Sequence, residues 1–260
     1  MKKTNISKTT AYHYAKFAGR LILFLTVLIL YIVNKVKYSD IDPLLEKFES
    51  NVHVMVICGI IWAIFIIEML MRFFPSKIES MGCQKQFKRN YVPAEQETKP
   101  NRQPAWRTFV AFASWIALNA VFVTLYFTKI IDGGVMIIIS LFYSVCDMIC
   151  ILFFCPFQTW MMKNRCCVSC RIYNWDFAMM FTPVVFIKNP FTISLFAVAF
   201  LLLLEWEILY RRYPERFCIN TNTTLSCANC KEKLCKHKKQ LRRFIKKIAE
   251  IEKRKNADKH

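Results

Sequence analysis

Glycine is scarce in this chain, and its scarcity excludes several classes of nucleotide-binding enzyme. The 260 residues include only five glycines, and none of them forms a Gly-x-Gly-x-x-Gly fingerprint or a phosphate-binding P-loop. The sequence also lacks the Gly-x-Ser-x-Gly and His-Glu-x-x-His motifs of serine hydrolases and zinc proteases. We therefore expect none of these activities.

Histidine and acidic residues are also few. No two of the four histidines lie in one long apolar segment, so we do not expect a haem held by two histidines. Asp and Glu total 18 against 37 Lys and Arg, which gives a formal net charge of +19. Most of this positive charge stands outside the apolar segments, and its distribution carries information about orientation.

Long apolar segments, by contrast, are plentiful. Hydrophobic residues make up 55% of the chain, and they gather in blocks near the ~20 residues that a membrane-crossing helix needs. We predict an all-α, polytopic integral membrane helical bundle with about six transmembrane helices. The predicted spans are 17–33, 52–74, 106–127, 135–154, 177–187 and 191–210.

The fifth predicted span, 177–187, is short and contains Pro183. Its apolar run covers only ~17 Å at 1.5 Å per residue. It crosses the membrane only if residues 172–176 extend the helix or if the bilayer thins locally. Otherwise it forms a re-entrant half-helix.

Positive charge predicts the orientation, because Lys and Arg favour the cytoplasmic side of a membrane. They are concentrated in the N-terminus (1–16), a flexible loop (75–105), a Cys-rich loop (156–176) and the tail (211–260). The connections within the three predicted hairpins carry little net positive charge. We therefore expect both termini in the cytoplasm. A composition rich in Lys and Ile, with cysteine clusters in the cytosol, suits a bacterial plasma membrane, and an organellar membrane is the alternative. The predicted hairpins are 17–74, 106–155 and 177–210.

Two Cys-x-x-Cys pairs carry the most specific chemistry in the sequence. The cytosol keeps thiols reduced, so cysteines spaced in this way favour a metal site over disulfides. Cys167 and Cys170 with Cys227 and Cys230 supply the four thiolates of a tetrahedral site. The hairpin between the pairs returns them to the same side of the membrane. Additional candidate ligands are Cys166, Cys218, Cys235 and His237.

The identity of the metal stays open at this point. The sequence Cys-Ala-Asn-Cys-Lys favours zinc, whereas an iron–sulfur cluster also uses four cysteines. A redox-active dithiol lacks the strand–helix context of thioredoxins. The remaining interpretation is that the cysteines are small, tolerated residues that bind no metal.

Ionisable residues inside predicted spans are candidates for function. Asp147 lies near the middle of 135–154, and an ionisable group at that depth by default indicates a proton path, an ion site or a substrate cavity. The alternative is that it joins helices through hydrogen bonds. Glu205 is a second candidate. Two other acids have a basic residue one turn further on, which predicts the local pairs Glu68–Arg72 and Glu207–Arg211.

The last segment, 236–260, predicts a basic amphipathic helix. Apolar residues recur at spacings of three and four, with Lys and Arg on the flanks. Such a helix favours anionic lipid headgroups, and packing on a protein partner or a second copy is the alternative. We do not expect nucleic acid as a partner, because no nucleic-acid-binding motif is present.

Three functions are compatible with these features. The leading one is a membrane scaffold or accessory subunit with a structural zinc site. The second is a membrane oxidoreductase whose iron–sulfur cluster passes electrons to a lipid-soluble acceptor. The third is a small transporter or channel that uses Asp147 at the bilayer midplane.

Overall fold

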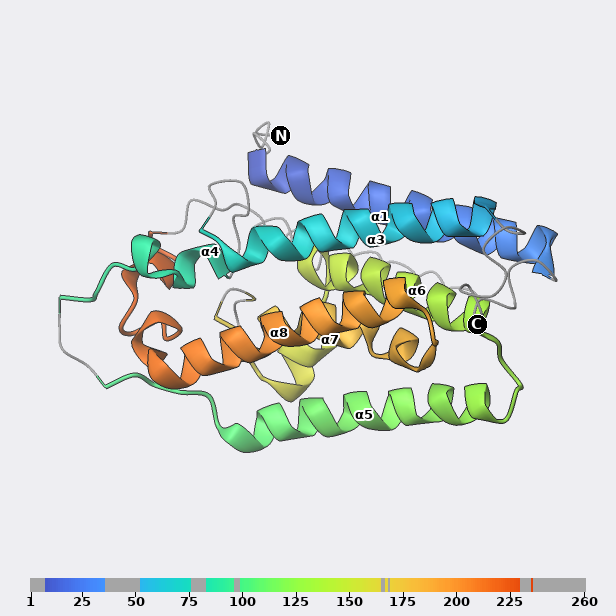
Figure 1. Ribbon diagram of the computed structural model, residues 1–260. Coiled ribbons are helices and arrows are strands. Elements are labelled where there is room, and N and C mark those ends of the chain that lie inside the picture. The colour runs from blue at the N-terminus through green and yellow to red at the C-terminus, as the bar shows by residue number, and fades with distance from the viewer. Residues whose placement is uncertain are drawn as a thin grey trace, which may run out of the picture.

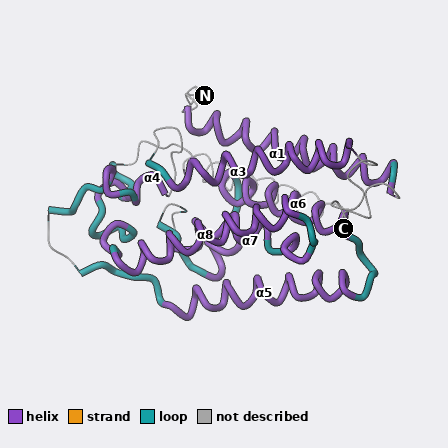
Figure 2. Tube along the Cα trace, viewed as in Figure 1, coloured by secondary structure: helices purple, strands orange, loops and turns teal. Residues whose placement is uncertain are grey.

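The computed structural model describes residues 8–35, 52–75, 83–95, 99–164, 167, 169–229 and 235. Within these residues the regular structure is helical, and the only β-type pairing is an isolated bridge between Pro93 and Asn222 (Figure 2). The predicted all-helical class is confirmed. The predicted amphipathic helix 236–260 lies outside the described residues.

Five helices are long and apolar enough to cross a membrane. Figure 1 shows that α3, α6 and α8 run in one direction and that α1 and α5 run in the other. This finding confirms the multi-pass character of the chain. The five helices are α1 (Lys8–Val33), α3 (Val52–Phe73), α5 (Ala105–Phe127), α6 (Gly133–Leu152) and α8 (Pro190–Arg212).

The predicted fifth span is a broken helix. It consists of η3 (Arg171–Trp175), α7 (Asp176–Phe181) and η4 (Pro183–Phe186). The break coincides with Pro183, which has no N–H to continue the hydrogen-bond ladder. Because α6 and α8 run in the same direction, this segment carries the chain back along the bundle (Figure 1). Helical turns do precede residue 177, but no single helix here is long enough to count as a span.

The core forms where α3, α6, α7 and α8 meet. Phe65, Met69, Leu141, Phe181 and Leu202 are each at most 2% exposed and belong to one apolar cluster. Many apolar side chains on the outer helix faces are exposed instead, which is compatible with lipid contact. In such a setting helices associate through close packing and polar contacts, because lipid is as apolar as the core.

Two segments cover one end of the bundle, where α1 and α5 begin and α3 and α8 end (Figure 1). We call it the capped end. The loop 83–95, with α4 (Cys83–Gln86) and η1 (Lys88–Asn90), packs against the tail 213–225, with η5 (Pro214–Arg216) and η6 (Thr223–Leu225). The described part of the loop that we predicted to be flexible therefore makes specific contacts.

Asn222 holds the two segments of the cap together. Its side chain is fully buried, and its Nδ2 donates to the carbonyl oxygens of Lys85 (3.2 Å) and Arg216 (2.8 Å). Its Oδ1 accepts from the Thr224 N–H at 3.1 Å. A buried amide satisfied in this way specifies one arrangement of the cap, since the loss of its partners would leave polar atoms unpaired.

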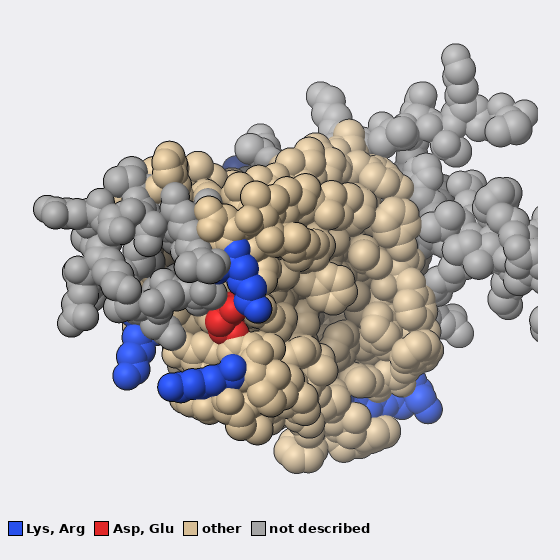
Figure 3. Space-filling model, turned by 90° about the vertical axis from the view of Figure 1, so that its right-hand side faces the viewer, with Lys and Arg blue, Asp and Glu red and all other residues tan. Residues whose placement is uncertain are grey.

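Figure 3 views the opposite end of the molecule, where the described surface is mostly uncharged, with a few basic and acidic side chains. The direction of the chain in a bilayer stays a prediction.

Candidate functional site

A cluster of buried charges joins the long helices near the capped end. Arg20 of α1 is 3% exposed, and its Nη1 donates to Asp147 Oδ2 at 2.9 Å and to the Ser144 carbonyl oxygen at 3.0 Å. Its Nη2 donates to Glu68 Oε2 at 2.6 Å, and Lys16 Nζ lies 3.0 Å from the same oxygen. One guanidinium thus connects α1, α3 and α6.

A second buried pair fixes the broken helix to α3. Arg72 Nη1 donates to Asp176 Oδ1 at 2.8 Å, and Arg72 Nη2 lies 2.6 Å from Oδ2. The Arg72 guanidinium also lies 4.6 Å from the Phe177 ring centroid, within the range of a cation–π contact. Arg72 therefore anchors α7 at its first turn.

These residues form what we call the charge cluster: Lys16, Arg20, Glu68, Arg72, Asp147 and Asp176. Three cations face three carboxylates, so its formal charge sums to zero. A buried charge is tolerated when it is paired and hydrogen-bonded, and removal of one partner is strongly destabilising. The arrangement explains how six ionisable side chains are accommodated between apolar helices.

Asp147 lies five residues before the end of α6 at Leu152, on the side of the helix centre that is nearer the capped end. Its depth in a bilayer stays a prediction. Its carboxylate is paired with Arg20, which fits the interhelical-contact interpretation of this residue. The sequence carried a signal for this partner, because Arg20 interrupts an apolar run where an unpaired cation is costly.

The structure pairs Glu68 and Glu207 with other helical segments. Glu68 contacts α1 rather than forming the expected simple pair with Arg72. Glu207 accepts from Arg171 Nη2 at 2.5 Å and from Trp175 Nε1 at 2.8 Å, so it is bound to η3 instead of Arg211. The i, i+4 spacing allowed the pairs Glu68–Arg72 and Glu207–Arg211. Tertiary packing instead places donors from other helical segments against Glu68 and Glu207.

Arg171 and Glu205 are two charged residues outside the charge cluster. Burial by itself would lower the pKa of Arg171, but the hydrogen bonds and charge of Glu207 raise it above the ordinary value. Glu205 is partly buried and lies outside the charge cluster. Its Oε2 is buried and accepts no hydrogen bond from the described residues.

The predicted metal ligands are only partly within the described residues. Cys167 and Cys170 are buried in one tight turn, in which the Cys170 N–H donates to the Cys167 carbonyl at 3.0 Å. Cys227 is exposed. The remaining predicted ligand, Cys230, lies outside the described residues, as do the additional candidates Cys166 and His237.

Cys218 and Cys235, two of the additional candidate metal ligands, differ in exposure. Cys218 is buried, and burial raises the pKa of its thiol above the usual value. Cys235 is exposed. Among the residues that the structure describes, no three Cys, His, Asp or Glu side chains are arranged as a formed metal site. The four-cysteine site therefore stays a prediction.

The two cysteine segments nevertheless fold against the same end of α6. Leu225, two residues before Cys227, belongs to an apolar cluster with Leu152, and Tyr173 packs against that cluster. The Tyr173 N–H donates to the Cys170 carbonyl at 3.0 Å, so the first cysteine turn adjoins this contact.

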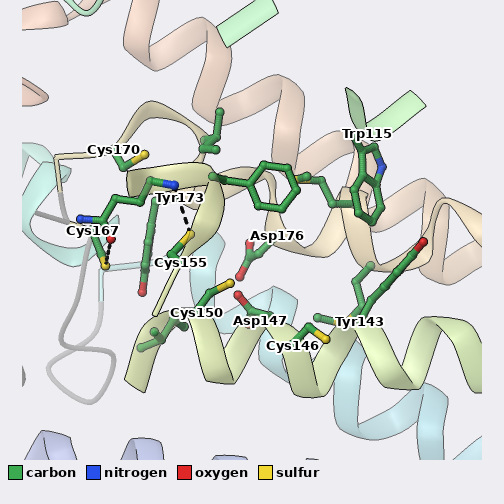
Figure 4. Close-up of a pocket in the computed structure, with 16 residues that line it drawn as sticks. Trp115, Tyr143, Cys146, Asp147, Cys150, Cys155, Cys167, Cys170, Tyr173 and Asp176 are labelled. Carbon is green, nitrogen blue, oxygen red and sulfur yellow. Dashed lines mark hydrogen bonds between the residues drawn. The ribbon is translucent and has the colours of Figure 1, made fainter. Parts of the chain in front are cut away.

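A cavity of about 130 Å³ lies between α5, α6 and α7 (Figure 4). Its walls include Trp115, Tyr143, Phe157 and Tyr173. This cavity was not predicted from the sequence, because three of its cysteines stand in or beside an apolar helix. Seven side chains of metal-ligating type line it: Cys146, Asp147, Cys150, Cys155, Cys167, Cys170 and Asp176.

Comparison of the chain with known proteins gives no functional assignment. No protein-family model, no curated protein and no solved structure matches it.

Proposed function

We propose that this protein is a multi-pass membrane scaffold or accessory subunit whose capped end is organised by a zinc ion bound to cysteine thiolates. The observation that supports it is the convergence of the two cysteine segments. Cys170 adjoins Tyr173, which packs against the apolar cluster that contains Leu225, two residues before Cys227. The predicted ligands are Cys167, Cys170, Cys227 and Cys230.

The chemistry of the first pair supports a structural role. Two residues between cysteines allow one tight turn to present both sulfurs to a single ion, and a closed four-thiolate shell is typical of structural zinc. Cys167 and Cys170 are both buried in such a turn. A metal ion bound there would hold the loop between α6 and η3 against the end of the bundle.

The charge cluster supports a non-catalytic interpretation of the intramembrane acids. Asp147 and Glu68 are bound to Arg20, and Asp176 is bound to Arg72. Carboxylates engaged in buried ion pairs stabilise helix contacts, and a proton or ion path would have to break those pairs. Plasma-membrane location, cytoplasmic termini and anionic-lipid contact through 236–260 belong to the same proposal.

Metal analysis with a visible absorption spectrum, on protein purified without oxygen, tests the proposal. We expect about one zinc per chain and no colour, because zinc has no d-electron transitions. Iron with labile sulfide would overturn the zinc assignment and favour electron transfer to a lipid-soluble acceptor.

Variants then test the ligands. Cys167→Ser and Cys170→Ser should each remove the bound metal and lower the melting temperature. Cys58→Ser is the matched control, since Cys58 is a buried thiol in a separate apolar cluster. Full metal content in Cys167→Ser and Cys170→Ser would contradict the proposal.

A further inference from the structure

Cys150 and Cys155 form a pair of neighbouring thiols in the wall of the cavity. Cys150 stands in the last turn of α6, and Cys155 follows the end of that helix. The Phe153 and Phe154 N–H groups both donate to the Ile149 carbonyl oxygen, at 2.8 and 3.1 Å, so the chain turns back at the helix end. The two thiols are therefore close enough to hydrogen-bond to each other (Figure 4).

Cys155 has the surroundings of the more reactive thiol of this pair. The Gln158 backbone N–H donates to Cys155 Sγ at 3.3 Å. A hydrogen bond donated to sulfur favours the thiolate, which is the nucleophilic form of cysteine. Cys150 and Cys155 are each only partly buried, whereas Cys167 and Cys170 of the same cavity are buried. The pair is thus the more accessible of the two.

The rest of the cavity wall is mostly apolar and rich in aromatic rings. The Trp115 ring centroid lies 4.7 Å from that of Tyr143 and 6.5 Å from that of Phe157. Figure 4 shows Trp115 and Tyr143 on one side of the space and Tyr173 on the other. Aromatic rings attract one another at such distances, so these walls favour a flat, apolar ligand.

The size of the cavity limits such a ligand to about one ring. Its volume is about 130 Å³, and an apolar cavity of about 150 Å³ in another protein binds benzene. The cavity lies between α5, α6 and α7, and both α5 and α6 are long and apolar enough to cross a membrane. A ring-sized ligand that dissolves in lipid fits this position.

We infer that Cys150 and Cys155 are a redox-active dithiol that reduces a lipid-soluble quinone bound in this cavity. The aromatic walls bind the quinone ring, and the dithiol supplies two electrons, the number that converts a quinone into a hydroquinone. The inference goes beyond the proposed function. It uses none of the four predicted zinc ligands, so both activities are compatible in one chain.

The atoms and electrons balance between the pair and the quinone. Both S–H bonds break, and one S–S bond forms between Cys150 and Cys155. The quinone takes up the two electrons and the two protons, and its two carbonyl oxygens become hydroxyl groups. Because an S–S bond is about 2.05 Å long, oxidation draws Cys155 closer to the end of α6.

Quinone reduction by the full-length protein tests the inference. The protein is purified in detergent, reduced, freed of reductant and mixed with decylubiquinone without oxygen. We expect about one hydroquinone per chain, because one dithiol carries two electrons. C150S and C155S should each lose this reaction. C58S is the control that should keep it, since Cys58 lies in a separate apolar cluster. Equal reduction by wild type and C150S would overturn the inference, as would a wild-type protein that reduces no quinone.

A second measurement uses the wild-type protein, so it stands even if C150S or C155S fails to fold. After reaction with decylubiquinone, free thiols are alkylated with iodoacetamide. The protein is then reduced and alkylated again with isotope-labelled iodoacetamide, and peptide mass spectrometry locates the second label. We expect it on Cys150 and Cys155. Its appearance on Cys167 and Cys170 instead would overturn the inference.

The choice of oxidant tests the role of the cavity. Oxidised glutathione also accepts two electrons from a dithiol, but it is polar and larger than a single ring. Decylubiquinone should therefore oxidise the pair faster than oxidised glutathione does at the same concentration. An equal or faster reaction with oxidised glutathione would overturn the assignment of a quinone to this cavity.

The outcomes also separate this inference from the proposed function. A wild-type protein that contains no zinc but reduces decylubiquinone overturns the zinc site and supports the redox pair. A protein that contains zinc but reduces no quinone overturns the redox pair alone.

Discussion

The charge cluster and the cysteine cavity lie side by side and differ in how their polar groups are satisfied. In the cluster, each carboxylate is matched by a cation from another helical segment, and the charges sum to zero. In the cavity, five thiols and two of the same carboxylates face a space of about 130 Å³. The charges of the cluster satisfy one another, whereas the cavity brings thiols together without arranging three or more of the described Cys, His, Asp or Glu side chains as a metal site.

The comparison also separates stability from binding. Ion pairs between apolar helices fix how the helices pack. Each charge needs its partner, because an unpaired buried charge is costly. Sulfur tolerates an apolar setting, so a buried thiol needs no ion pair. Changes in the cluster should therefore destabilise the fold more than changes around the cavity.

Arg20→Met should have the largest effect. It leaves Glu68 and Asp147 without their shared guanidinium, and the loss of one partner of a buried pair costs about 3–5 kcal/mol. Unfolding in detergent, followed by circular dichroism, measures the change. Arg211→Met is the control, since Arg211 is exposed. Equal loss in both variants would contradict a central role for the cluster.

Gln158→Met should have a smaller effect, confined to the cavity. It preserves side-chain length but removes the contacts that its amide makes with Cys167 and Asn164. Buried polar atoms left without these partners cost about 1–3 kcal/mol of stability. Unfolding in detergent, followed by circular dichroism, measures the change. Met179→Leu, which alters another side chain that lines the cavity, should leave stability near wild type, and equal loss in both variants would contradict a role for these hydrogen bonds.

The smallest effect concerns the pH dependence of Cys218. Burial raises the pKa of its thiol, so the thiolate that reacts with alkylating agents forms at a higher pH than in an ordinary cysteine. Its alkylation should still be increasing above pH ~8.5, the usual midpoint for a free thiol. The same peptide in denatured protein is the control. Identical pH profiles would show that burial does not affect this thiol.

The raised pKa of Cys218 also makes the stability of the folded protein depend on pH. The folded state holds the Cys218 proton to a higher pH than the unfolded state does. The contribution of this group to stability is therefore complete below the unfolded pKa and is lost as the pH rises above it.

Local patterns predicted most of the helices correctly. Apolar runs placed four of the long helices within a few residues of their ends, since the length of an apolar block limits a span directly. Pro183 indicated that the segment near 177–187 would be interrupted, and the break occurs there.

The partners of the charged residues could not be predicted in the same way. No partner was predicted for Arg20, which binds acids 48 and 127 residues away. Glu207 was assigned to Arg211 by helical spacing, but η3 brings Arg171 to it. Spacing along one helix carries no information about which face of another helix packs against it.

The sequence by itself determined the helical class and the multi-pass character. These properties depend on composition and on contacts between neighbours along the chain. Only the tertiary structure decided that Arg20 neutralises two acids and that Cys150 and Cys155 share a cavity with Cys167 and Cys170. Such groupings arise when separate helices pack, because packing alone sets the distances between residues far apart in the chain.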